Sequence, residues 1–404
     1  MILAAVLALH FGRVIDGHGG VIKDAVIVVD GDRIKSVGHD IPKDAKVVDL
    51  TKYTALPGLI DVHTHMTYYW DRTPGTRPWA QLGTLHDAVT VYLAQENAKK
   101  ALESGVTTVR DLGSFNYLDV AMRDLINRGA MIGPRMFVAG FGLHVSTNPP
   151  KWGVRDAMDY GRADGVAEVQ RVAREQLGAG ADWIKMYGST GSDQDVTGFE
   201  TYSLEEMKAA ADVAHRAGKK IAIHSYGPDG ARDAIRAGAD SVEHATDMDA
   251  ATIAELAKSN TVYVPTVDHN RYYAAHKDEF GYNDEVVKRL NDYIARNFET
   301  LKKCVAAHVK IAMGSDAVFT GFGENARELD WFVKAGMTPS EALATATTNA
   351  AALLGKEKDL GAIAPGYYAD IIAVEGDPLA DISVLTKGNL PWVMASGHIV
   401  IERK

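Results

Sequence analysis

The sequence predicts an α/β protein: a (β/α)8 TIM barrel with a small β domain built from both ends of the chain. The centre of the chain alternates β-rich runs with amphipathic helical stretches, whereas the two ends contain strand and turn sequence. The length of 404 residues suits a barrel of about 250 residues plus a satellite. We expect residues 58–357 to form the barrel and residues 1–57 and 358–404 to form the discontinuous β domain.

The strands of the barrel are predicted by β-rich runs that alternate with helical segments, a pattern that requires parallel pairing. Eight such runs are present: Leu59–His65, Thr107–Leu112, Arg135–Val145, Trp183–Tyr187, Lys220–Ser225, Ser241–Ala245, Val262–Val267 and Val309–Ser315. Apolar spacing predicts helices between them, for example over Leu204–Arg216 and Val286–His308. The repeated Ala-Gly-Ala-Asp at 179–182 and 237–240 predicts two equivalent turns from helix to strand.

The terminal segments predict the β domain. Strand-like runs cover 26–34 and 46–50 near the N-terminus and 370–374 and 392–400 near the C-terminus. Neither segment has enough apolar surface to fold alone, so we expect the two to share one domain.

Charge and composition limit the partners. The chain has 43 Lys and Arg against 53 Asp and Glu, and this formal charge of −10 argues against a nucleic-acid or anionic-membrane surface. No stretch reaches the roughly 20 apolar residues of a membrane span. The apolar run Met1–Leu9 has no basic region and no cleavage pattern, so a cytoplasmic location is expected. A secreted or periplasmic chain without its signal peptide would have the same sequence features.

The single cysteine, Cys304, excludes an internal disulfide and is expected to pack in the core.

Candidate functional residues gather at the ends of the predicted strands, where barrels of this class carry their active sites. The first strand ends in Asp61-Val-His63-Thr-His65, and alternation along a strand places both histidines on one face. Each candidate has a plain structural explanation, such as a hydrogen bond to a loop or a helix cap. Six such residues at the mouth of one barrel nevertheless predict a metal site, because separate structural explanations for all six are improbable. They are His63, His65, Lys185, His224, His244 and Asp316.

The lysine indicates what kind of metal site to expect. A charged ammonium is costly in an apolar strand, but a neutral amine can react with CO₂ to form a carbamate whose two oxygens bridge two metals. His63, His65 and Asp316 would then hold one divalent ion and His224 and His244 the other, with carbamylated Lys185 and a hydroxide shared. Zinc is expected from imidazole and carboxylate ligands, and cobalt or manganese would fit the same set.

These motifs resemble the amidohydrolase superfamily across nearly the whole chain. The resemblance is carried by 57–65 (PGLIDVHTH), 105–111 (GVTTVRD), 361–370 (GAIAPGYYAD) and 376–378 (GDP). The binuclear branch with a carbamylated lysine is indicated by 183–185, 224–226, 243–244 and 314–316. Within that branch the chain is most similar to the imidazolonepropionase-related group, which contains Xaa-Pro dipeptidases and carboxypeptidases and ochratoxin-hydrolysing amidases.

The resemblance implies a β-sandwich at the termini, a homo-oligomer and hydrolysis of an amide or dipeptide substrate, with release of a C-terminal L-amino acid. Asp316 would move the proton from the attacking hydroxide to the leaving amine. His144 and Tyr226 resemble substrate-binding positions, Tyr226 as a contact of the substrate's carboxylate. Asp61 is expected to support the ligands rather than to bind metal. From their place after the seventh strand, His269 and Arg271 could also face the pocket.

Three other functions stay open at this point. Hydrolysis of a cyclic amide, as in imidazolonepropionase, would differ only in the pocket loops. A deaminase of the same superfamily usually works with one metal and lacks the bridging lysine. A non-catalytic oligomeric scaffold would have lost the site, whereas all six candidate ligands are present here.

Overall fold

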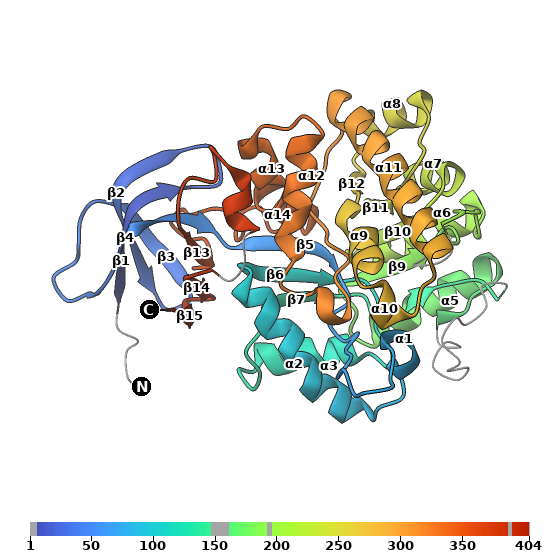
Figure 1. Cartoon of the computed structure of the whole chain (residues 1–404), viewed down its shortest axis with the longest axis horizontal. Helices are drawn as coiled ribbons and strands as arrows, with labels where there is room; N and C mark the ends of the chain where they lie inside the picture. Colours follow the sequence, from blue (N-terminus) through green and yellow to red (C-terminus); the bar gives the residue numbers. More distant parts are fainter. Residues whose placement is uncertain (1–5, 147–160, 192–195, 387–389, 404) are drawn as a thin grey trace.

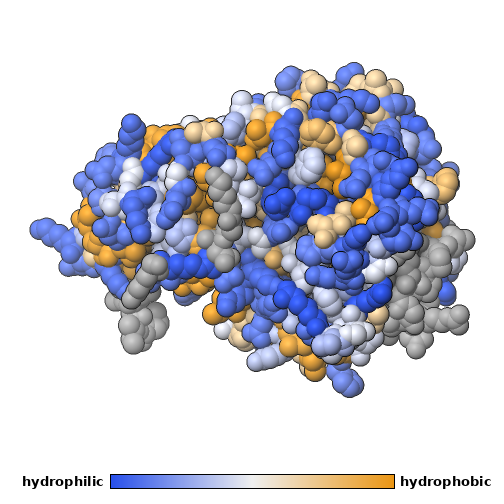
Figure 2. Space-filling model, in the orientation of Figure 1, coloured by the Kyte–Doolittle hydropathy of each residue, from blue (hydrophilic) through white to orange (hydrophobic). Residues whose placement is uncertain are grey.

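The computed structural model describes residues 6–146, 161–191, 196–386 and 390–403. It shows the expected (β/α)8 barrel with a β-sandwich beside it (Figure 1). The first five residues of the apolar Met1–Leu9 run lie outside the described residues, and Leu7 begins the first strand. Among the described residues, no helix is long and apolar enough to cross a membrane. Figure 2 shows hydrophilic side chains over much of one face, with smaller hydrophobic areas between them.

Strands from both ends of the chain form one seven-stranded sheet, in the order β15-β14-β13-β4-β1-β2-β3. Their bounds are β1 Leu7–Ile15, β2 Val21–Asp30, β3 Arg33–Gly38, β4 Lys46–Pro57, β13 Ile371–Val374, β14 Trp392–Ala395 and β15 His398–Glu402. In a flat sheet β1 and β14 would lie roughly 14 Å apart. The ring centroids of Phe11 and Trp392 on these strands are only 6.2 Å apart, so the sheet folds over to enclose a core.

The barrel strands pair in parallel as β5-β6-β7 and as β8 to β12. Their bounds are β5 Leu59–Thr64, β6 Val106–Asp111, β7 Arg135–Val138, β8 Gly142–Leu143, β9 Trp183–Tyr187, β10 Lys220–Ser225, β11 Ser241–His244 and β12 Val262–Val264. Every residue of β5, β6 and β11 is buried, as expected for parallel strands that are covered on both faces.

The eighth predicted strand, Val309–Ser315, is not a continuous strand, but its backbone closes the barrel. Tyr263 N donates to Lys310 O at 2.8 Å on the β12 side, and Val62 N donates to Met313 O at 2.9 Å on the β5 side. Isolated parallel bridges join Tyr263 to Ile311 and Thr64 to Ala317. The segment therefore occupies the eighth position of the ring with few regular ladder bonds.

Two other strand predictions are wrong in extent. The expected strand Arg135–Val145 is split into β7 and β8, because Gly140 between them has a left-handed φ of 66°. The expected strand Val262–Val267 ends at Val264. Pro265 has no N–H for a ladder, and Thr266 has φ 47°, so the chain turns there into a helix that begins at Val267.

Helices surround the barrel (Figure 1). They are α1 Pro78–Gln81, α2 Asp87–Glu103, α3 Leu118–Asn127, α5 Gly165–Gly178, α6 Leu204–Arg216, α7 Pro228–Arg236, α8 Ala250–Lys258, α9 Val267–Ala275, α10 Lys277–Phe280, α11 Asp284–Ala306, α12 Glu328–Lys334, α13 Pro339–Thr345 and α14 Thr348–Leu353, with 3-10 turns η2 Phe319–Gly321, η3 Asn325–Arg327 and η4 Ile382–Leu385. The predicted helix Leu204–Arg216 is confirmed, and Ser203 and Glu206 close a capping box at its start. Cys304 is buried in α11, where burial raises the pKa of its thiol to about 12.

Candidate metal centre

The barrel brings the six predicted ligands to the carboxyl ends of its strands. His63 lies in β5 and His65 follows it, Lys185 lies in β9, His224 in β10, and His244 ends β11. Asp316 follows the segment that closes the barrel. His244 and Asp316 have left-handed φ values of 69° and 52°, a backbone conformation that is uncommon for residues other than glycine. Asp316 N donates to His63 O at 2.7 Å, which holds this turn against β5.

His63, His244 and Asp316 form the core of the site. All three are buried, and one potential ligand atom from each lies within 4.8 Å of the other two. Asp316 Oδ1 is 3.2 Å from His65 Nε2 and 3.6 Å from His63 Nε2. Three imidazoles and one carboxylate thus converge on one small volume, which is the type of ligand set that binds zinc and similar divalent ions.

Lys185 and His224 extend the group on the β9 and β10 side. Lys185 is 1% exposed, and its Nζ lies 3.4 Å from His63 Nε2. The ring centroids of His224 and His244 are 4.5 Å apart. Within the described part of the chain, His224 Nε2 is buried without a hydrogen-bond partner. A buried imidazole nitrogen with no partner fits a metal ligand, because burial without a partner is otherwise costly.

The charge states in the site also fit a metal. Burial lowers the pKa of His63, His224 and His244 well below the usual range, so their imidazoles are neutral. Burial also lowers the pKa of Lys185 to about 8. At Asp316 burial acts to raise the pKa, but the neighbouring histidines outweigh it and hold the carboxyl well below its usual pKa. Neutral imidazoles and an ionised carboxylate are the forms that bind metal ions.

The outer nitrogen of three of the candidate ligand histidines has a defined partner. His63 Nδ1 lies 2.7 Å from Glu243 Oε2, His65 Nδ1 lies 3.0 Å from Gly113 O, and His244 Nδ1 lies 2.6 Å from Thr266 Oγ1. In each case the partner turns Nε2 of the ring toward the site.

Asp61 supports the site without joining the ligand group. Its carboxylate accepts hydrogen bonds from His63 N at 3.1 Å, Ser315 N at 3.0 Å and Asn325 Nδ2 at 2.8 Å. These bonds tie β5 to the turn that carries Asp316. Burial raises the pKa of Asp61 to about 6.

The two predicted substrate residues lie in different surroundings. Tyr226 is buried beside the histidines, and its ring stacks on His224 with centroids 5.0 Å apart. Its hydroxyl lies 3.5 Å from Asn270 Nδ2. His144 directly follows β8, is half-buried and has Nδ1 3.1 Å from Gly142 O. Residues 147–150, which follow it along the chain, lie outside the described ranges.

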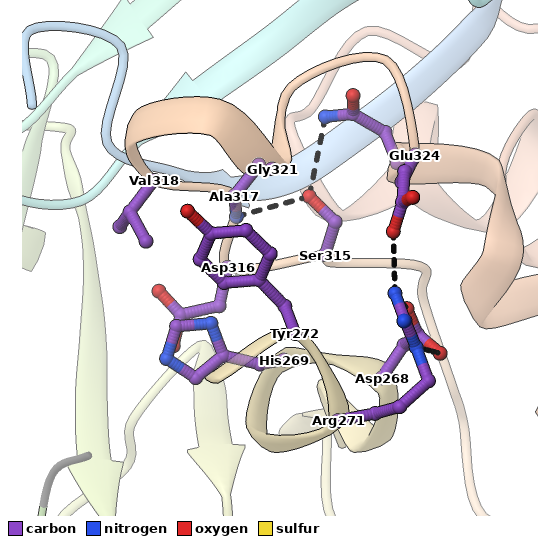
Figure 3. A pocket seen from close by; sticks show the side chains of 11 residues that line it. Asp268, His269, Arg271, Tyr272, Ser315, Asp316, Ala317, Val318, Gly321 and Glu324 are labelled. Carbon is purple, nitrogen blue, oxygen red and sulfur yellow. Dashed lines mark hydrogen bonds and ion pairs between the residues drawn. The ribbon is translucent and has the colours of Figure 1, made fainter. Parts of the chain in front are cut away.

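A pocket opens beside Asp316, between the start of α9 and the turn after residue 314 (Figure 3). His269 points toward Asp316 in this pocket, and its Nε2 is 3.1 Å from Asp316 Oδ2. Arg271 also lines the pocket, but its guanidinium pairs with Asp268 at 2.8 Å and with Glu324 rather than with Asp316. His269 therefore faces the pocket and directly contacts a candidate ligand.

Glu243 and Arg110 are the residues that strand-end reasoning missed. Both point into the barrel interior and are fully buried. Glu243 directly precedes a candidate ligand in the motif Glu243-His244, and Arg110 is part of the second-strand motif 105–111. A charged residue inside a buried strand is the signal that identifies both.

Comparison with known proteins identifies the family. A sequence model described as the amidohydrolase family matches residues 54–400. The chain is 32% identical to an ochratoxinase from Aspergillus niger, covering 94% of this chain and 83% of the relative. It is 25% identical to an imidazolonepropionase from Streptomyces coelicolor, covering 88% and 86% of the two chains. The crystal structure of a Xaa-Pro dipeptidase with bound methionine in the active site superimposes with a TM-score of 0.88 at 31% identity, covering 98% of this chain and all of that one. The chain thus belongs to the amidohydrolase family and is a hydrolytic enzyme that acts on amide bonds.

Proposed function

We propose that this enzyme releases a C-terminal L-amino acid from dipeptides or N-acyl amino acids. The observation that carries the proposal is the buried group at the barrel mouth, where Lys185 Nζ and Asp316 Oδ1 both lie within 3.6 Å of His63 Nε2. The relatives support the substrate class, since one is named a dipeptidase with a bound amino acid and another an ochratoxinase.

The proposed cofactor is a pair of divalent cations, with zinc first and cobalt or manganese as alternatives. His63, His65 and Asp316 would hold one, and His224 and His244 the other. The buried His224 Nε2, which has no partner in the described ranges, fits this assignment. Divalent cations would supply Lewis acidity, which polarises a carbonyl group and acidifies water.

Lys185 is proposed to be carbamylated and shared between the two cations. Its pKa of about 8 leaves part of the amine neutral near pH 7, the form that reacts with CO₂. Among the residues that the structure describes, the only hydrogen-bond partner of Nζ is His63 Nε2. An ammonium ion that is buried without a carboxylate partner is costly. The surroundings of Lys185 therefore suit a modified amine better than a charged one.

Asp316 is proposed to carry the proton in the reaction. Its Oδ1 faces His63 and His65, whereas its Oδ2 faces His269 on the pocket side. A water molecule adds its oxygen to the substrate carbonyl carbon, and Asp316 accepts the proton. When the C–N bond breaks, Asp316 returns that proton to the leaving nitrogen, so that a carboxylic acid and an amine are formed.

Tyr226 and His144 are proposed to bind the substrate, with Tyr226 at its free carboxylate. The stacking of Tyr226 on His224 places it beside the proposed metal pair. Tyr68, which stacks on His65 with centroids 4.6 Å apart, belongs to an aromatic cluster that suits an apolar part of the substrate.

The remaining parts of the proposal concern partners. We propose a small-molecule amide or dipeptide substrate, a homo-oligomer, and no nucleic-acid or membrane partner. The compartment is proposed to be the cytoplasm, with a secreted or periplasmic location as the alternative. Hydrolysis of a cyclic amide is the second candidate function, because imidazolonepropionase is among the relatives.

A mixed-substrate assay tests the proposed function. The zinc-loaded protein is incubated with dipeptides, N-acyl amino acids, cyclic amides and aminopurines, and the products are read by mass spectrometry. The Asp316→Asn variant is the background control. We expect release of free C-terminal amino acids. Addition of water without fragmentation would establish the cyclic-amide alternative, and a gain of about one mass unit, from exchange of an amino group for oxygen, would indicate deamination. Turnover of none of these compounds would contradict the proposed substrate class.

A further inference from the structure

The orientation of His63 is controlled by a charged group inside the barrel. His63 Nδ1 lies 2.7 Å from Glu243 Oε2. An ionised carboxylate only accepts hydrogen bonds, so the proton is on Nδ1 and the lone pair is on Nε2. That Nε2 is the atom that lies 3.4 Å from Lys185 Nζ and 3.6 Å from Asp316 Oδ1.

The Glu243 carboxylate is in turn fixed by Arg110, which reaches across the barrel from β6 to β11. Arg110 Nη2 donates to Glu243 Oε1 at 2.9 Å, Nη1 donates to Ser241 Oγ at 2.9 Å, and Nε donates to Val62 O. The guanidinium carbon lies 4.4 Å from the centre of the Trp183 ring, which packs against it. Both side chains of the pair are 0% exposed. One guanidinium thus holds the carboxylate and the backbone next to His63.

We infer that Glu243 and Arg110 are positioning residues for the metal centre: Arg110 locks Glu243, and Glu243 presents the Nε2 lone pair of His63 to the ion. The inference rests on the proposed metal centre. A buried ion pair adds little to stability over an apolar pair of the same volume, so stability alone is a weak reason for this arrangement. A carboxylate behind a ligand histidine both orients the ring and increases its basicity.

The three ligand histidines with outer partners differ in a way that supports this role. His65 faces a backbone carbonyl and His244 faces a threonine hydroxyl, and both of these partners are neutral. In the described ranges, His63 is the one of the three whose outer partner is charged. Arg110 balances that charge, so Glu243 adds basicity to His63 without adding net negative charge to the interior.

The test is metal affinity, measured on the metal-free protein by Zn²⁺ competition with a chromophoric chelator. In the Glu243→Gln variant Arg110 retains the amide oxygen, which turns the amide NH₂ toward His63 Nδ1 and reverses the tautomer. We expect Zn²⁺ affinity to fall by about 10- to 100-fold. The visible absorption of bound Co²⁺ is a second readout, and we expect it to change because the coordination of the ion changes.

Glu243→Gln leaves the buried Arg110 without an ionised partner, and this variant could fail to fold. A second, charge-neutral variant is therefore included. Arg110→Met combined with Glu243→Gln removes both charges, and we expect it to fold and to bind Zn²⁺ at least about 10-fold more weakly than the wild type, since a neutral amide is a weaker acceptor. The matched control is Asp370→Asn. Asp370 is another buried carboxylate paired with an arginine, Arg135, and it accepts from Ser396 N at the opposite end of the barrel.

The outcomes separate the inference from the function on which it rests. Weaker Zn²⁺ binding in both Glu243 variants, with wild-type affinity in Asp370→Asn, supports the positioning role. Wild-type affinity and an unchanged Co²⁺ spectrum in the Glu243 variants would overturn it, whatever their thermal stability. A wild-type protein that binds neither ion would instead overturn the metal centre itself.

Discussion

At the scale of the residue, Lys185 distinguishes the proposed binuclear site from a single-metal site. We expect Lys185→Ala to lose bound metal and activity, because two bridging oxygens disappear with the carbamate. A short carboxylic acid added to this variant restores part of the activity, since it supplies two oxygens of the same kind. Metal analysis and substrate turnover measure both effects. Lys220→Ala is the control, because Lys220 begins β10 at the other end of the strand and binds Leu353 O. Full metal content and activity without Lys185 would remove it from the site.

Tyr226 tests the proposed recognition of a substrate carboxylate. We expect Tyr226→Phe to raise KM for free-carboxylate substrates by about 10-fold or more, since a hydrogen bond to a charged group is worth about 1.5 to 3 kcal/mol. KM for the corresponding amides would change less. Steady-state kinetics on matched pairs of substrates measure this difference. The control is Tyr293→Phe, because the Tyr293 ring stacks on Tyr226 while its hydroxyl accepts from Thr246. An equal rise for both substrate types would remove Tyr226 as the carboxylate contact.

The six candidate ligands could be predicted because strand ends in a barrel converge, whatever the details of packing. The residues that hydrogen-bond the outer nitrogens of these histidines could not be predicted. In the sequence Glu243 is simply the residue before His244, and nothing there indicates its partner. Only the fold shows that its side chain reaches His63, 180 positions away. His269 was hard to place for a different reason. It stands in the first turn of α9, and the expected strand continued to Val267, so its side chain had no predictable direction.

At the scale of the element, the start of α9 depends on a buried carboxyl group from another helix. Thr266 precedes α9, but its hydroxyl is paired with His244 and does not cap the helix. Glu328 of α12 takes this role: Oε1 accepts from Val267 N at 2.8 Å and Oε2 accepts from Asp268 N at 2.9 Å. Glu328 thereby fixes the turn that carries His269.

We expect Glu328→Gln to lower the free energy of unfolding by about 1 to 3 kcal/mol. An amide has one acceptor oxygen, whereas both oxygens of the Glu328 carboxyl group accept here, so a buried N–H is left without a partner. Urea denaturation measures the loss. Glu324→Gln is the matched control in the same region, since Glu324 is 45% exposed and pairs with Arg271 at the surface. We expect that change to cost less than about 1 kcal/mol. Equal losses for the two variants would contradict the capping role.

Elements with strong local signals could be predicted closely, and those held by tertiary contacts could not. The strands Trp183–Tyr187 and Lys220–Ser225 match the expectation, and the capping residues Ser203 and Glu206 mark the start of α6. The segment 309–315 has the composition of a strand, but its ladder is limited to an isolated bridge at Ile311 and another just beyond the segment, at Ala317. The break at Gly140 depends on packing: its φ is 66°, and a Cβ there would lie 2.7 Å from Gln176 Oε1 and 2.9 Å from the Tyr117 ring.

At the scale of the whole molecule, both ends of the chain meet in the β-sandwich and contact the barrel. Gly58 N donates to Asp370 O at 2.8 Å, and Arg403 pairs with Glu103 of α2 at 3.3 Å. We propose that residues 1–57 and 358–404 form one domain, as the sequence predicts. The site lies at the other end of β5 from Gly58, so the sandwich supports the barrel without lining the site.

Metal removal tests the site as a property of the whole barrel. The proposed ligands come from β5, β9, β10, β11 and the closing segment, so bound ions would cross-link strands around the ring. A ligand that binds only the folded state stabilises it by about 4 kcal/mol when its free concentration is 1,000 times Kd. We therefore expect a chelator to lower Tm and Zn²⁺ to restore it, with Tm rising as free Zn²⁺ increases. His63→Ala should abolish this dependence. The control His215→Ala should keep it, because His215 lies on α6 and pairs with Asp240 at the surface. A wild-type Tm that is the same in chelator and in Zn²⁺ would show that the histidine group does not hold metal in the folded barrel.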